Sequence, residues 1–259
     1  MDAWRTALVD ARDGQIRVRG HDVPSLMRHA TFTDTIFLLH RGCLPNDRER
    51  RILDAILTSS ADHGPGAPSC ATARLAASGN RQSLSAAIAA GVLAIGNEHG
   101  GAGELCMQLI ADGLTRVKTR GISIEAAAED VLGDARREGR RLPGLGHRVH
   151  NVDPRVEVLF DLARQGDRDG DGVTFMRALH KAVSAAVKPM PINIDGALAA
   201  LLHDLGFPAQ AGKLLFIISR VAGLTAEVAE EYAREKPMRI RIPVEYDGVP
   251  PIADDAGPA

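Results

Sequence analysis

Apolar residues recur at helical spacing along most of this 259-residue chain. The longest such stripe lies near the C-terminal end and contains Leu214, Ile217, Val221, Leu224 and Val228. It predicts a helix from about Gln210 to Arg234, because every third or fourth residue of a helix shares one face. Periodicity and helix caps predict further helices at about 33–41, 46–61, 69–77, 83–97, 102–113, 123–138, 155–165, 174–187 and 195–205.

Extended segments are expected only near the two ends of the chain. Short apolar runs flank Asp13-Gly14, a dipeptide that favours a tight turn. This pattern predicts a β-hairpin at residues 6–19. Residues 239–246 predict a second extended segment. The expected fold is therefore mainly α, with small β elements near both termini.

Composition narrows the classes of function. The formal net charge is −2, so a general nucleic-acid binder, which needs a basic face, is not expected. Cys43, Cys70 and Cys106 are widely spaced, which predicts neither a disulfide framework nor a zinc site. The first residues lack an apolar targeting segment, and no apolar run is long enough to span a bilayer. We expect a cytoplasmic protein without a bound metal or a membrane partner.

The segment from Gly144 to Arg155 concentrates residues that bind anions. Gly144 and Gly146 precede His147, and Arg148 and Arg155 follow it. An imidazole on a glycine-rich loop between guanidinium groups suits a small, highly charged anion that also exchanges a proton. A solvated basic loop before a capped helix is the alternative interpretation.

Two more histidines stand beside glycine. His63 precedes Gly-Pro-Gly, and His99 precedes Gly-Gly. A single histidine at a helix end more often caps the last turn than binds a ligand. Three such histidines, counting His147, weaken that explanation, and their spacing does not match a metal motif.

One aspartate and two further arginines complete the set of candidate residues. Asp195 either caps a helix or serves as a general base on an apolar-flanked turn, where loss of water raises its basicity. Arg220 lies on the flank of the long C-terminal helix, where it either extends toward water or points into a cleft at an anion. Arg241 is either a charge on an edge strand or a clamp for a partner's site.

Together these residues suit chemistry next to a carbonyl group. Arginine binds carboxylates with two parallel hydrogen bonds, and imidazole can stabilise a developing enolate. A carboxylate can take a proton from carbon. The set therefore favours making or breaking a carbon–carbon bond in a polycarboxylate.

Six regions of the chain, in this order, resemble the citrate synthase superfamily. They are residues 19–45, 61–64, 98–102, 144–155 and 193–195, and the pair 218–220 with 241–246. The resemblance covers nearly the whole chain. It implies an α-helical fold, assembled as interlocked homodimers or larger homo-oligomers, that acts on coenzyme A thioesters as substrates and has no permanently bound cofactor.

The resemblance also implies a role for each candidate residue. Asp195 takes the α-proton of an acetyl thioester, His99 hydrogen-bonds the enol oxygen, and His147 exchanges a proton with the oxaloacetate oxygen. The carboxylate-binding residues are His63, Arg155, Arg220 and Arg241, the last from a second subunit. Weaker candidates for binding coenzyme A are Arg140, Arg141, Gly144 and Gly146.

The chain departs from full-length citrate synthases between Pro45 and the Asp62-His63 pair. Only residues 46–61 lie there, where the synthases carry a long helical region. This short form more closely resembles citryl-CoA lyases and the lyase module of ATP citrate lyase. It implies a truncated large domain, formed by about 1–140 and 210–259, and a small domain at about 141–209.

The sequence thus predicts a lyase that cleaves citryl-CoA to acetyl-CoA and oxaloacetate. A short citrate synthase, or a related enzyme that condenses another acyl-CoA with a 2-oxoacid, is the first alternative. A homologue that only binds acyl-CoA or citrate is the second, although a pure binder needs no general base such as Asp195.

Overall fold

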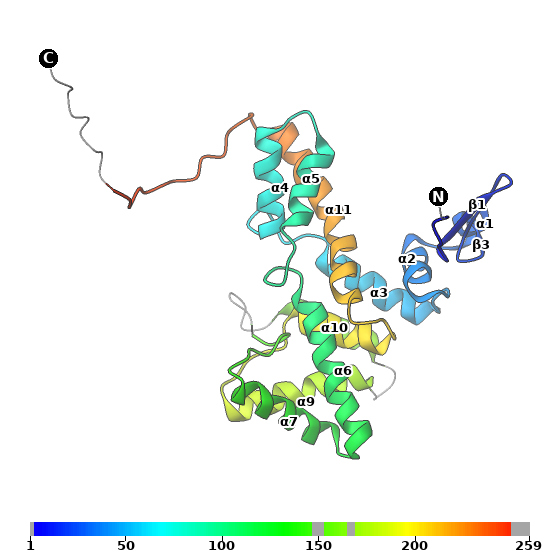
Figure 1. Ribbon diagram of the computed structural model, residues 1–259, viewed down its shortest axis with the longest axis vertical. Coiled ribbons are helices and arrows are strands. Elements are labelled where there is room, and N and C mark those ends of the chain that lie inside the picture. Colours follow the sequence, from blue (N-terminus) through cyan, green and yellow to red (C-terminus); the bar gives the residue numbers. More distant parts are fainter. Residues whose placement is uncertain (1–2, 147–152, 165–168, 250–259) are drawn as a thin grey trace.

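The computed structural model describes residues 3–146, 153–164 and 169–249. Helices dominate this part of the chain, and a small sheet precedes them (Figure 1). The strands are β1 (Val9–Arg12), β2 (Gln15–Val18) and β3 (His21–Asp22). The helices are α1 (Val23–His29), α2 (Phe32–Arg41), α3 (Asp47–Ser60), α4 (Pro68–Gly79), α5 (Leu84–Leu93), α6 (Ala102–Arg120), α7 (Ile124–Arg137), α8 (Pro154–Ala163), α9 (Asp171–Ala186), α10 (Ile194–Asp204) and α11 (Ala211–Arg234).

The predicted N-terminal hairpin is confirmed. Strands β1 and β2 pair antiparallel, from Val9 opposite Val18 to Arg12 opposite Gln15, and β3 extends the sheet beyond β2. The turn residues Asp13 and Gly14 have φ angles of 54° and 71°, the left-handed region that a primed turn requires. Helix α1, which follows the sheet, is seven residues long and too short to show a periodic stripe.

The second β element expected near the C-terminus does not form. Among the described residues, 239–249 contain no strand, and they leave the body of the molecule as a single extended trace (Figure 1). A strand needs a neighbour to pair its backbone groups, and no other strand lies beside this segment in the described chain. Within residues 3–146, 153–164 and 169–249, the sheet is therefore confined to the N-terminal end.

Local signals placed most helix ends correctly. Thr31 with Asp34 and Asn46 with Glu49 form reciprocal caps at the starts of α2 and α3. Gly42 ends α2 at a φ of 79°. These caps confirm the predicted helices at the N-terminal end.

The buried apolar residues form two clusters. The large cluster joins α3, α6, α7, α8, α9 and α10, with Ile110, Phe160, Phe175 and Leu201 fully buried in it. The small cluster lies between α4, α5 and α11 and consists of Ala67, Cys70, Ala73, Ala77, Ala87, Leu224 and Val228. Helix α11 spans both clusters, and Figure 1 shows it running from the α10 end to the α4–α5 end.

Helices α6 and α7 pack against α9 and α10. The division into a large and a small domain stays a prediction. In the part of the chain that is described, no helix is both long and apolar enough to cross a membrane.

Candidate active site

His99 lies in a tight loop between α5 and α6. Helix α5 ends at Leu93, earlier than the predicted Asn97, and the backbones of Gly96 and His99 exchange hydrogen bonds of 3.0 and 3.1 Å. Gly100 has a φ of +81°, and a Cβ there would collide with the Phe216 ring of α11. Only glycine fits this position, so the loop holds His99 in a fixed place against α11.

The His99 ring is anchored to the first turn of α4. Its Nε2 lies 3.3 Å from the backbone nitrogen of Ser69 and 2.8 Å from the Ser69 hydroxyl. The backbone N–H can only donate, so Nε2 accepts and the neutral ring carries its proton on Nδ1. Burial, followed by the charges of Arg220 and His63, lowers the pKa of His99. The ring is therefore a neutral hydrogen-bond donor near pH 7.

Replacing Ser69 with alanine tests this anchoring. The Ser69→Ala variant keeps the backbone N–H but loses the hydroxyl, so the ring is held by one weaker contact. If His99 has its predicted role at the enol oxygen, kcat falls about 10-fold, because a misplaced catalytic group loses transition-state stabilisation. Thermal unfolding should be nearly unchanged. The control for loss of a hydroxyl is Thr72→Ala, also in α4, where the half-buried Thr72 hydroxyl donates to the Pro68 carbonyl. A kcat equal to the wild-type value would contradict the anchoring role.

Arg155 and Arg220 meet at the C-terminal end of α3. The Nη1 of Arg155 donates to the Ser59 carbonyl and the Nε of Arg220 to the Ser60 carbonyl, both at 3.1 Å. These are neighbouring carbonyls, so the two guanidinium groups lie close together. The chain then continues directly to His63, whose charge acts on His99.

The two arginines differ in their surroundings. Arg220 is 3% exposed, lies over the Phe216 ring at 5.0 Å, and has Nη1 3.6 Å from the Cys70 sulfur. It therefore points inward, and the alternative of a side chain extended into water is excluded. Arg155 is paired with Asp153 through two contacts, of 2.9 and 2.7 Å.

Asp195 is the second residue of α10, and of its two interpretations the one as N-cap is wrong. The cap is Asn193, whose Oδ1 accepts from the Gly196 N–H at 3.1 Å. Asp195 lies near Cys106 of α6. Burial, followed by the negative charge of Asp195, raises the pKa of the Cys106 thiol. The Asp195 carboxylate is half-buried, and its role as a general base stays a prediction.

The glycine loop lies against the turn that precedes α10. Gly144 and Gly146 have φ angles of +83° and +80°. Gly146 N donates to Pro191 O at 2.7 Å, and Asn193 N donates to Gly144 O at 3.0 Å. His147, the next residue in the chain, lies outside the described residues.

A cleft of about 710 Å³ opens between the His99 loop and the glycine loop. Its lining includes Glu98, Arg140, Arg141, Gly144 and Asn193. Three of the four predicted coenzyme A residues therefore share one cleft with neighbours of His99 and Asp195. Gly146 does not line it.

Arg241 is apart from these residues. It is exposed on the extended C-terminal segment, whose nearer end is held by the ion pair of Arg239 with Glu231. Within one copy of the chain, the structure does not bring Arg241 to Arg155 and Arg220.

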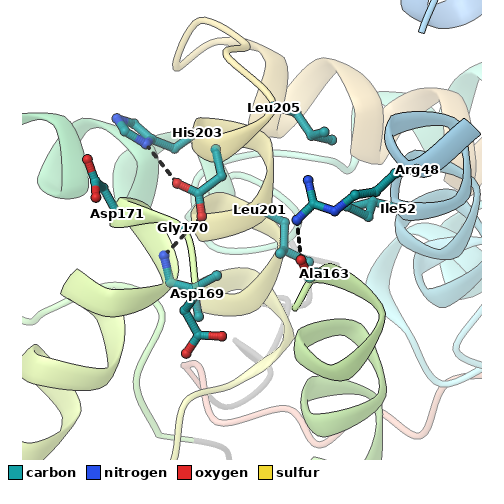
Figure 2. A pocket seen from close by; sticks show the side chains of 11 residues that line it. Arg48, Ile52, Ala163, Asp169, Gly170, Asp171, Leu201, His203 and Leu205 are labelled. Carbon is teal, nitrogen blue, oxygen red and sulfur yellow. Dashed lines mark hydrogen bonds and ion pairs between the residues drawn. The ribbon is translucent and has the colours of Figure 1, made fainter. Parts of the chain in front are cut away.

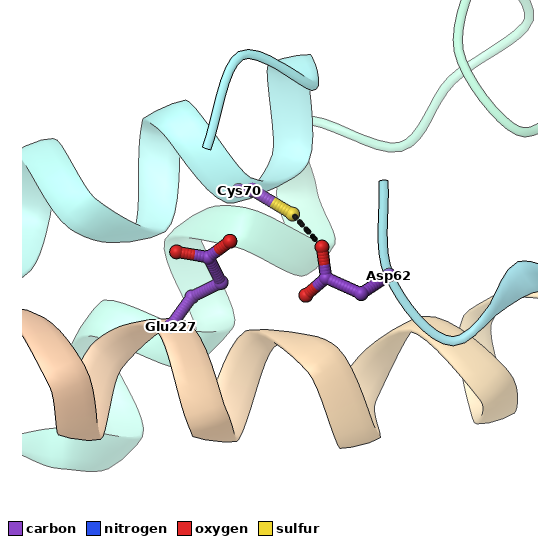
Figure 3. Close-up of side chains that lie close together, drawn as sticks. All are labelled: Asp62, Cys70 and Glu227. Atoms are coloured by element: carbon purple, nitrogen blue, oxygen red, sulfur yellow. Dashed lines mark hydrogen bonds between the residues drawn. The ribbon is translucent and has the colours of Figure 1, made fainter. Parts of the chain in front are cut away.

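Behind Arg220, Asp62, Cys70 and Glu227 bring three potential metal-ligand atoms within 4.8 Å of one another (Figure 3). Arg74 is ion-paired with Glu227, and the Arg220 guanidinium lies against the Cys70 sulfur. These cations already compensate the negative charge, so the group does not fit a metal site. Sequence reasoning missed Arg74 and Ser69, because neither has a local signal.

A second cavity, of about 550 Å³, lies away from the cleft, between α3, α9 and α10 (Figure 2). The Asp204 carboxylate accepts hydrogen bonds from the Gly172 and Val173 N–H groups, at 2.7 and 3.2 Å. Because Gly170, the N-cap of α9, has no side chain, Asp204 caps the helix instead. The Asp204 carboxylate at this cavity therefore serves to cap helix α9.

Comparison with known proteins agrees with this geometry. The family model described as "Citrate synthase, C-terminal domain" matches residues 45–241. The 2-methylcitrate synthase of Shewanella oneidensis is 30% identical over 219 residues, which are 83% of this chain and 55% of that enzyme. The chain thus spans about half the length of such curated relatives.

Solved structures match over a longer range. The citryl-CoA lyase of Hydrogenobacter thermophilus is 36% identical, with a TM-score of 0.88 over 97% of each chain. The ATP citrate lyase of Methanosaeta concilii shares the fold, at 19% identity and a TM-score of 0.76, over 95% of this chain and 42% of that one. From the family model and these matches, the chain belongs to the citrate synthase family.

Proposed function

We propose that the protein is a carbon–carbon lyase that cleaves citryl-CoA to acetyl-CoA and oxaloacetate. The observation that carries the proposal is the match to a citryl-CoA lyase over 97% of each chain. The short sequence between Pro45 and His63 supports it, because this stretch contains a single helix, α3.

The site residues divide the reaction between them. His147 takes the proton of the citryl hydroxyl, and the carbon–carbon bond then breaks to leave a carbonyl on oxaloacetate. The electron pair moves into an enolate of the thioester, whose oxygen is stabilised by the Nδ1–H of His99. Protonated Asp195 gives its proton to the enolate carbon, which completes acetyl-CoA.

The arginines hold the carboxylates of the substrate. Arg155, Arg220 and His63 surround the end of α3, where a dicarboxylate can accept several charge-assisted hydrogen bonds. The thioester arm extends along the cleft past Arg140 and Arg141. A neighbouring hollow of about 460 Å³ adds Arg136 and Lys188, which suits the phosphates of coenzyme A.

A citrate synthase that also hydrolyses the thioester uses the same residues, and the curated relatives favour this alternative.

Two assays distinguish the lyase from the synthase. In the first, purified protein is given citryl-CoA, and oxaloacetate release is followed with malate dehydrogenase and NADH. The same preparation is given acetyl-CoA and oxaloacetate, and free thiol is measured. Oxaloacetate release without free thiol supports the lyase, and strong thiol release from the second pair identifies a synthase. If the protein reacts neither with citryl-CoA nor with acetyl-CoA and oxaloacetate, both proposed activities are contradicted, and a homologue that only binds these ligands remains.

The site is completed in a homodimer. Helix α5 carries no charged residue from Ser83 to Gly96, yet Leu84 is 54% exposed and Leu93 85% exposed. A helix that is apolar on all sides is normally buried, so its outer face contacts a second copy. That contact also provides a place for the exposed Arg241 of the other subunit.

A charge on α5 tests the dimer. Ala89 is exposed, and Ala89→Glu places a carboxylate in the apolar contact, where its burial without a partner is unfavourable. We expect sedimentation to show monomer at concentrations where the wild type is dimeric. Ala111→Glu, on the exposed face of α6, should leave the dimer intact. A wild-type monomer, or an Ala89→Glu dimer, would refute this interface.

A further inference from the structure

The side-chain amide of Asn193 joins two segments that carry different parts of the site. Its Oδ1 accepts from the Gly196 N–H at 3.1 Å and so caps α10, the helix of Asp195. Its Nδ2 donates to the Gly146 carbonyl at 2.8 Å, in the glycine loop. The acceptor and donor belong to one planar group, so they fix the helix and the loop relative to each other.

Backbone contacts show how closely the two segments approach. Two backbone hydrogen bonds join the same segments, from Gly146 N to Pro191 O at 2.7 Å and from Asn193 N to Gly144 O at 3.0 Å. A Cβ on Gly144 would lie 2.8 Å from the Gly196 Cα, so the chains touch without side chains between them. The Asn193 amide adds a side-chain hydrogen bond across this contact.

We infer that Asn193 is a positioning residue, which sets the spacing between the Asp195 carboxylate and the glycine loop at Gly146. The inference rests on the proposed function, in which Asp195 transfers a proton to carbon. Such a transfer depends on placement to a fraction of an ångström. Asp, Ser and Thr also cap helices, but none has an amide that can donate to Gly146 while it caps.

The Asn193→Ser variant separates the two roles. A serine hydroxyl keeps the cap of α10, but it is too short to reach the Gly146 carbonyl. The matched control is Asn46→Ser, at the start of α3, where Asn46 accepts from the Arg48 and Glu49 N–H groups. Both variants exchange one asparagine cap for serine, and only the first loses the link to the loop.

We expect Asn193→Ser to lower kcat at least ~10-fold, with KM within about threefold of wild type, because positioning acts on the chemical step. Its melting temperature should match that of Asn46→Ser. Hydrogen exchange of the peptide that contains Gly146 should be faster in Asn193→Ser alone. Unchanged exchange, an unchanged kcat, or a kcat loss that parallels a larger loss of stability would each overturn the inference.

The exchange measurement does not depend on turnover. If the wild-type protein acts on neither citryl-CoA nor acetyl-CoA with oxaloacetate, the proposed function fails. Exchange at Gly146 then decides by itself whether Asn193 positions the loop.

Discussion

The Asp195→Asn variant should bind substrate and lose turnover by about 10³-fold, because in the proposed mechanism it removes the group that exchanges a proton with carbon. Helix α10 should be unaffected, since Asn193 rather than Asp195 provides its cap. We expect the dissociation constant for acetyl-CoA, measured by calorimetry, to stay within a few-fold of the wild-type value.

The control for this variant is Asp171→Asn. Asp171 is an exposed carboxylate in the first turn of α9, so it reproduces the loss of one charge near a helix N-terminus. This control should keep wild-type turnover. Wild-type turnover in Asp195→Asn itself would show that a different residue exchanges the proton with carbon.

The largest effect on stability is expected from Arg74. This buried arginine of α4 is ion-paired with Glu227, Glu230 and Glu231 of α11, and Glu231 is fully buried. Arg74→Met takes the Arg74 cation away from the buried Glu227 and leaves Glu231 with Arg239, and breaking a buried pair in this way typically costs about 3–5 kcal/mol. Urea unfolding should show this loss, whereas Arg120→Met, which breaks an exposed pair with Asp130, should change the free energy of unfolding by less than about 1 kcal/mol.

The same cluster predicts a dependence on pH. Burial raises the pKa of Glu231, but Arg239 and Arg74 outweigh this effect, so the net pKa lies below its ordinary 4.5. A lowered carboxyl pKa contributes stability above the ordinary value, and this is lost as the pH falls through the folded-state pKa. In Arg74→Met the pKa of Glu231 rises, so acid unfolding should begin at a higher pH. Equal acid midpoints would contradict the coupling.

Sequence signals succeeded where the determining contacts are local. The caps at Asn46 and Ser123 and the turn at Asp13-Gly14 depend on neighbours within three residues, and each was predicted. The histidine and arginine segments were found as candidates for the same reason, through their adjacent glycines and family motifs.

Sequence signals failed where distant residues decide. Gly113 predicted the end of a helix, but α6 continues to Arg120. This glycine does not end the helix; it leaves room for the Phe175 ring, which occupies the space that a side chain at 113 would need. Asn193 and Asp195 are both good caps two residues apart. The tertiary bond to Gly146 selects Asn193. The contacts of Ser69 with His99 and of Arg74 with α11 join residues at least 30 positions apart.

The contact between Gly144 and Gly196 limits how such a protein can diversify. A methyl group on Gly144 would lie 2.6 Å from the Cys106 sulfur and 2.8 Å from the Gly196 Cα, so neither glycine can be exchanged to reshape the substrate space. In the proposed lyase, adaptation to a longer acyl chain must therefore use the replaceable side chains around the cleft, such as Leu105, Leu142 and Leu145. Libraries aimed at new thioesters should vary these leucines and leave the glycine pair fixed.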